Sequence, residues 1–158
     1  MSKLVFIAAV FISQICVAQK ARIVKLPELQ RVISQATHDV HIINFWATWC
    51  APCVKELPFF ENLTRERKND IKVTLVSLDL DLDPNPEKVY KFIARKNLQS
   101  EVLLLDEQDP NSWIDRIDPQ WNGALPATII LNGRTGKRIF IGRSLEEGEL
   151  EQYISQIQ

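Results

Sequence analysis

Two cysteines separated by two residues, Cys50 and Cys53, are the part of this chain best suited to chemistry. They follow a dense apolar run and stand where a helical pattern begins. The unpaired N–H groups and the dipole of a helix N-terminus stabilise an anion by roughly 0.3–1 kcal/mol, which favours the thiolate of Cys50. We therefore expect Cys50 to attack a disulfide and Cys53, one turn inward, to resolve the mixed disulfide. Pro52 falls in the first helical turn, where its missing N–H costs nothing.

The cysteine spacing alone is a weak signal, because half of a zinc site and two packed cysteines without a role have the same pattern. His38 and His41 are candidate nitrogen ligands, but both precede the core end of the strand that leads to Cys50. We expect them to be solvated or loop histidines and predict no metal site. The alternating acidic residues 79–83 begin like a calcium loop, but Pro84 occupies the position that needs glycine.

The composition is that of one soluble globular domain. The 158 residues are 46% hydrophobic and 25% charged, which excludes a disordered or collagen-like chain. The 19 Lys and Arg residues against 20 Asp and Glu residues leave a net charge of −1, so no basic excess exists for binding nucleic acid. Three cysteines are too few for a disulfide-scaffold protein.

Residues 1–18 have the pattern of a secretory signal peptide. Lys3 gives a positive start, residues 4–12 are uninterruptedly apolar, and Cys16 and Ala18 are small residues suited to a cleavage site. The apolar run is shorter than the about 20 residues that a membrane-spanning helix needs. We expect cleavage and a mature domain over residues 19–158 in an extracytoplasmic compartment, either periplasmic or secreted. An uncleaved membrane anchor and lipid attachment at Cys16 are the alternatives.

Short apolar runs that alternate with helical periodicity predict a mixed α/β domain. We expect strands at residues 40–46, 71–80, 101–105, 127–131 and 137–141, the last two joined as a hairpin. Helices are expected at residues 29–36, from 51 to about 68, after an Asn85 N-cap, at 111–117 and at 150–157. On the second of these helices, Glu61 and Arg65 have the spacing of an i,i+4 ion pair.

The segment around the cysteines resembles the thioredoxin superfamily, and within it the TlpA/ResA-like extracytoplasmic thiol-disulfide oxidoreductases. Trp49 to Cys53 matches the Trp-Cys-x-Pro-Cys core, and Pro58 stands where thioredoxins have a kinking proline. Leu125 and Pro126, before the hairpin, match the cis-proline loop. The resemblance covers residues 19–158. It implies a thioredoxin-like fold, a central mixed sheet flanked by helices, with the helix–strand insertion of TlpA-type members between residue 80 and Pro126.

The resemblance also implies roles for residues around the dithiol. A cis Pro126 would lie against the cysteines and leave the backbone of Leu125 free to pair with an extended substrate segment. Trp49, just before the nucleophile, and Pro52 then belong to the substrate platform. Trp46 is expected in the core, and the two remaining tryptophans, at positions 113 and 121, are left open between core packing and a partner surface.

Two positions depart from plain thioredoxin. Asn44 stands where thioredoxin has a buried aspartate, and its side chain cannot exchange a proton. Glu56 lies about one turn after Cys53, as does the active-site glutamate of TlpA/ResA-like proteins. We expect Glu56 to exchange the proton of Cys53, with a pKa raised beside a dry thiol. A solvated surface glutamate is the alternative.

The leading functional prediction is a thiol-disulfide oxidoreductase that reduces disulfides of secreted proteins and has no cofactor. Ala51 and Pro52 between the cysteines lack the histidine of strong oxidants, which favours a reducing potential. The resemblance implies a membrane thiol-transfer protein as electron donor and apocytochrome c as one candidate substrate. We expect a monomer. The alternatives are a thioredoxin-fold copper metallochaperone, which usually has wider cysteine spacing and a downstream histidine, and a non-catalytic interaction module.

Overall fold

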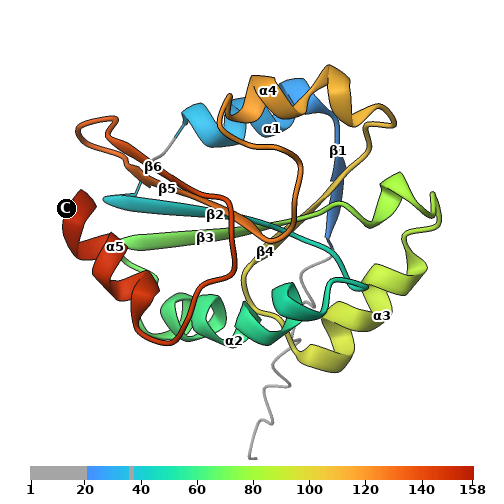
Figure 1. Cartoon of the computed structure of the whole chain (residues 1–158). Helices are drawn as coiled ribbons and strands as arrows, with labels where there is room; N and C mark the ends of the chain where they lie inside the picture. The colour runs from blue at the N-terminus through green and yellow to red at the C-terminus, as the bar shows by residue number, and fades with distance from the viewer. Residues whose placement is uncertain (1–20, 36–37) are drawn as a thin grey trace, which may run out of the picture.

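The computed structural model describes residues 21–35 and 38–158, arranged as a central sheet between two layers of helices (Figure 1). The predicted signal peptide lies outside the described residues. Six strands form one mixed sheet in the order β1-β4-β3-β2-β5-β6. Strands β1 to β4 pair in parallel, and β5 and β6 are antiparallel. Their bounds are β1 (Arg22–Val24), β2 (Val40–Trp46), β3 (Ile71–Ser77), β4 (Glu101–Leu105), β5 (Ala127–Asn132) and β6 (Arg138–Ile141).

The helices cover both faces of the sheet. Figure 1 shows α1 and α4 on one face and α2, α3 and α5 on the other. The α-helices are α1 (Leu26–Ser34), α2 (Ala51–Glu66), α3 (Glu87–Lys96), α4 (Ile114–Ile117) and α5 (Glu149–Ile157), and the 3-10 helices are η1 (Asp79–Asp81) and η2 (Pro110–Ser112). In the chain, α3 and β4 follow η1 and precede α4. They are the helix–strand insertion that the sequence predicts. None of the helices in the described ranges is long and apolar enough to cross a membrane.

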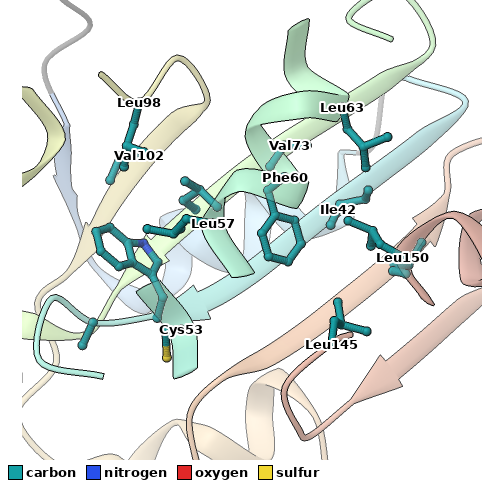
Figure 2. Close-up of a cluster of buried hydrophobic side chains, with 14 of the residues drawn as sticks. Ile42, Cys53, Leu57, Phe60, Leu63, Val73, Leu98, Val102, Leu145 and Leu150 are labelled. Atoms are coloured by element: carbon teal, nitrogen blue, oxygen red, sulfur yellow. The ribbon is translucent and has the colours of Figure 1, made fainter. Parts of the chain in front are cut away.

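The core has two halves because successive side chains of a strand point to opposite faces of the sheet. On β2, Ile42 and Trp46 pack under α2, whereas Ile43 and Phe45 pack under α1 and α4. Figure 2 shows the first half, in which side chains of α2, from Cys53 at one end through Leu57 and Phe60 to Leu63, line the sheet. Both cysteines therefore belong to the packed half of the core under α2.

Most predicted elements are confirmed, and the differences concern ends and edges. Strands β2 and β4 have the predicted bounds. The N-cap of α3 is Pro86, one residue after the predicted Asn85. The side chain of Asn85 still satisfies a free backbone donor at the helix start, because its Oδ1 accepts a hydrogen bond from the N–H of Glu87 at 3.0 Å. Strand β3 ends at Ser77, earlier than predicted, and the chain turns there into η1. Strand β1 was not predicted; it is a short edge strand paired with β4.

The predicted ion pair between Glu61 and Arg65 is wrong. Glu61 is buried, and its carboxylate accepts hydrogen bonds from the N–H groups of Gln99 at 2.6 Å and Ser100 at 3.1 Å. Arg65 instead donates to the side chain of Asn62. The two backbone N–H groups just before β4 would each cost about 1–3 kcal/mol if they were buried without an acceptor. An exposed ion pair contributes only about 0–1 kcal/mol, so the carboxylate of Glu61 binds the backbone and not Arg65.

Candidate active site

The two cysteines form a disulfide at the N-terminus of α2. Cys50 is the N-cap residue, and its Sγ accepts a hydrogen bond from the N–H of Cys53 at 3.3 Å. This is the contact expected of a sulfur that a helix N-terminus stabilises. Cys50 is 5% exposed and Cys53 fully buried, so the first sulfur is the more accessible one, as predicted. Pro52 is exposed in the first turn of α2.

The turn before Cys50 is held by the chain that follows β3. The carboxylate of Asp79 accepts hydrogen bonds from both the N–H and the hydroxyl of Thr48, the former at 2.9 Å. The same carboxylate accepts from the hydroxyl of Ser77 at 2.8 Å. The N–H of Leu78 donates to the carbonyl of Trp46 at 2.9 Å. These bonds fix residues 46–48 and leave the following side chain, Trp49, half exposed.

Glu56 is buried on α2, one turn after Cys53, and not a solvated surface residue. Its Oε1 accepts a hydrogen bond from Nδ2 of Asn44 at 3.0 Å, and its Oε2 accepts one from the N–H of Leu145 at 2.8 Å. Burial raises the pKa of Glu56 to about 6, although both hydrogen bonds act in the opposite direction. The predicted upward shift of the pKa is confirmed. A carboxyl with this pKa can both accept and return a proton near neutral pH.

The cis-proline loop lies at the same end of the sheet. The Leu125–Pro126 peptide bond is cis, as predicted. Ala127 pairs with Phe45 in the antiparallel register of β2 and β5, so Pro126 reaches the end of β2 from which the chain leads to the dithiol. Leu125 packs against the apolar cluster that contains both cysteines. The topology thus brings together the cysteines and the loop that the sequence identifies.

The tryptophans divide between core and surface. Trp46 is fully buried and packs against Phe92, with ring centroids 5.3 Å apart, which confirms its predicted core position. Trp113 and Trp121 are buried in the second half of the core and in contact, with centroids 5.5 Å apart. The question left open for these two residues is therefore answered in favour of core packing.

The histidine expectation is wrong for His41. This side chain is buried in β2, where its Nε2 lies 2.9 Å from Oγ1 of Thr74. Burial lowers the pKa of His41 to about 4, so the imidazole is neutral at ordinary pH. Within residues 21–35 and 38–158, no group of three or more His, Cys, Asp or Glu side chains gathers as a metal site would require.

Sequence comparison places the chain among redox proteins. The Redoxin family model matches residues 20–132. Over 117 residues the chain is 31% identical to the thiol-disulfide oxidoreductase ResA of Bacillus cereus. This alignment covers 73% of this chain and 61% of ResA. Over 67 residues it is 41% identical to a thioredoxin of Mycobacterium tuberculosis, covering 42% of this chain and 53% of that protein. The matched stretch thus spans about half the length of the mycobacterial thioredoxins.

Solved structures agree on the fold. A thioredoxin-related protein from Neisseria meningitidis serogroup B has a TM-score of 0.64 at 21% identity, covering 77% of this chain and 86% of the other. StoA from Bacillus subtilis has a TM-score of 0.58 at 22% identity, and the match covers 75% of this chain and 85% of StoA. These likenesses establish a thioredoxin-like fold. Together with the match over residues 20–132, they show that the chain belongs to the Redoxin family of thioredoxin-like proteins.

Proposed function

We propose that this protein is a thiol-disulfide oxidoreductase that reduces disulfides of secreted proteins through Cys50 and Cys53. The observation that carries the proposal is the position of the Cys50–Cys53 disulfide, with the first sulfur capping α2. Two cysteines so close in sequence close too short a loop to stabilise a fold much. Their placement at a helix N-terminus favours a reactive thiolate instead.

The reaction needs the dithiol form and moves two electrons to the substrate. The thiolate of Cys50 attacks one sulfur of the substrate disulfide, that bond breaks, and the other substrate sulfur leaves as a thiolate and takes up a proton. Cys53 then loses its proton and attacks the Sγ of Cys50. The mixed disulfide breaks, the second substrate thiol is released, and the Cys50–Cys53 disulfide forms.

Glu56 is proposed to accept the proton of Cys53 in the second step and to return it when the dithiol is regenerated. Its burial, its place one turn after Cys53 and its pKa of about 6 support this role. Asn44 is proposed to orient the carboxylate through the 3.0 Å hydrogen bond, since an amide cannot itself exchange the proton.

The substrate platform is proposed to consist of side chains and backbone around Cys50. Trp49 is half exposed beside the nucleophile, and Pro52 is exposed in the first turn of α2. Leu125 and the cis Pro126 form the opposing loop. The backbone of Leu125 would pair with an extended substrate segment, as an added strand pairs with a sheet edge.

We infer a reducing direction and an extracytoplasmic location from the sequence. No histidine lies between the cysteines, and the first 18 residues have the pattern of a cleaved signal peptide before a domain at 19–158. A membrane thiol-transfer protein would then return electrons to the oxidised form. Apocytochrome c before haem attachment is one candidate among the secreted substrates.

The test is disulfide reduction by the purified domain, with insulin as the substrate and dithiothreitol as the electron source. We expect activity in the wild type, none in Cys50→Ser, and an accumulating mixed disulfide in Cys53→Ser. Equilibration with glutathione should give a potential nearer to the about −270 mV of thioredoxin than to the about −120 mV of DsbA. An inactive wild type that retains stoichiometric Cu(I) against a chelator would contradict the proposal and favour a metallochaperone.

A further inference from the structure

Two large exposed apolar side chains, Trp49 and Leu82, lie on the segments that follow β2 and β3. Over the described residues the exposed large hydrophobic side chains are Trp49 at 51%, Leu82 at 71% and Ile23 at 48%. Trp49 follows β2 and Leu82 follows β3, and these strands are parallel neighbours, so both residues lie at the same edge of the sheet. Ile23 lies on the edge strand β1.

Hydrogen bonds connect the segments that carry Trp49 and Leu82. Thr48, the residue before Trp49, donates its N–H and its hydroxyl to the carboxylate of Asp79. The N–H of Leu82 donates to the backbone carbonyl of Asp79 at 3.1 Å. A single residue, Asp79, therefore holds both segments.

The backbone on both sides of Leu82 is fixed, while its side chain is left in solvent. Asp83 Oδ1 accepts from the N–H of Asn85 at 3.0 Å, which organises the turn that follows. The side chain of Leu80, in the same segment, packs against the apolar core, whereas the side chain of Leu82 is exposed to solvent. Single exposed apolar residues are common, whereas apolar side chains that are grouped on a surface are the ones that mark interaction sites.

We propose that Leu82 and Trp49 form one apolar surface that binds the substrate next to its reactive cysteine. This inference rests on the proposed function. The occupant is a substrate segment with an apolar side chain close in sequence to the disulfide. The exposed carboxylate of Asp83 follows Leu82, so the neighbouring substrate residues should be neutral or basic, because like charges would repel each other.

The test compares two synthetic peptides, each with a central cysteine activated as a mixed disulfide with thionitrobenzoate. One peptide has Leu on both sides of the cysteine and the other has Ser, with neutral residues elsewhere. We expect reduced wild-type protein to prefer the Leu peptide about tenfold in kcat/KM, since burial of a leucine side chain contributes that much or more. In Leu82→Ser the preference should fall to about threefold or less, through a higher KM with unchanged kcat.

Two controls separate binding from folding. Ile23→Ser removes an exposed apolar side chain away from the dithiol and should keep the full preference. Dithiobis-nitrobenzoate has no leucine side chain to place on Leu82, so its rate of reduction should be equal in the wild type and Leu82→Ser. A Leu82→Ser variant that keeps the tenfold preference would overturn this inference alone. A wild type that reduces neither the peptides nor dithiobis-nitrobenzoate would overturn the proposed function as well.

Discussion

The side-chain amide of Asn44 lies 3.0 Å from Oε1 of Glu56, and both residues are almost completely removed from solvent. The amide also donates to Oγ1 of Thr128 at 3.1 Å, across the β2–β5 pair. The carboxylate is thus tied to the strand that leads to Cys50 and to the strand that follows Pro126. Its second oxygen binds the N–H of Leu145. The Glu56 carboxylate is therefore hydrogen-bonded to the segment at Leu145 and, through Asn44, to β5.

Glu56 should make the oxidised protein less stable as pH rises. Its pKa is raised from 4.5 to about 6 on folding, mainly by burial, so the folded state binds a proton more tightly than the unfolded state does. The stabilisation is present below pH 4.5 and is lost as pH rises through 6. The loss in free energy of unfolding is on the order of 2 kcal/mol. Other groups, His41 among them, titrate in the same range and contribute equally to both proteins, so the difference in stability between the wild type and Glu56→Gln isolates the effect of Glu56. In urea unfolding at a series of pH values, this difference should shift against the wild type by that amount as pH rises through 6.

A matched control for this experiment is Glu66→Gln, which changes an exposed glutamate on the same helix. Its stability should follow the wild-type dependence on pH. The oxidised form is used so that no thiol titrates. Equal slopes in Glu56→Gln and the wild type would show that the carboxyl keeps its ordinary pKa in the folded protein.

Glu56 should also set the pH dependence of the resolving step. If the carboxylate takes the proton of Cys53, the release of the second substrate thiol should speed up as pH rises through about 6 in the wild type. In Glu56→Gln the step should be at least about tenfold slower at pH 7, because general bases contribute about a hundredfold or more. Rapid mixing with a peptide disulfide, quenched by alkylation, measures this rate. An unchanged profile in the variant ends the proposed role.

Asp79 should be required for the turn before the nucleophile. Asp79→Ala leaves the N–H and hydroxyl of Thr48 and the hydroxyl of Ser77 without their acceptor, at a cost of about 1–3 kcal/mol for each group left buried. We expect at least about 2 kcal/mol lower stability by urea unfolding, and slower reduction of disulfides. Asp79→Asn keeps an acceptor and a similar shape, so it should lose less of both.

The comparison for Asp79 is Asp83→Ala, in the same acidic segment but exposed. Asp83→Ala removes one exposed hydrogen bond, from the N–H of Asn85, and should cost about 0.5–1.5 kcal/mol, less than Asp79→Ala. Equal losses in Asp79→Ala and Asp83→Ala would mean that the acidic segment acts through its charge and not through the bonds to Thr48.

The sequence predicted the elements whose own residues determine them. β2 and β4 are short apolar runs bounded by polar residues, and their ends are where the pattern ends. The helix start at residue 51 and the hydrogen bond from the N–H of Glu87 to Asn85 depend on neighbours within three positions. The cis bond before Pro126 was predicted only because the loop resembles a known family, since no local pattern separates it from an ordinary loop proline.

Buried polar residues were the part that the sequence did not predict. Glu61, Asp79 and His41 are of types usually found at surfaces, and each is buried by a partner far along the chain. The partner of Glu61 is the backbone at residues 99–100, and that of Asp79 is Thr48. Such pairs exist only after the strands assemble. β1 was missed for a similar reason, because three residues become a strand only against β4.

Trp121 should support the cis-proline loop as well as the core. Its Nε1 donates to the carbonyl of Ala124 at 2.8 Å, one residue before Leu125, and its ring packs on Phe45 with centroids 4.6 Å apart. Trp121→Ala should cost about 3–5 kcal/mol of stability. Trp121→Phe keeps a ring but loses the bond to Ala124, so we expect about 1 kcal/mol from that bond and a higher KM for peptide disulfides with unchanged kcat.

Trp113→Phe is the matched variant, because Trp113 is buried in the same cluster but its Nε1 has no hydrogen-bond partner in the described part of the chain. Both substitutions remove a similar volume from the core, so both should lower stability. The rise in KM should occur with Trp121→Phe alone, since only that side chain holds the carbonyl before the loop. If Trp113→Phe raises the KM equally, core packing and not the bond to Ala124 positions the segment that meets the substrate.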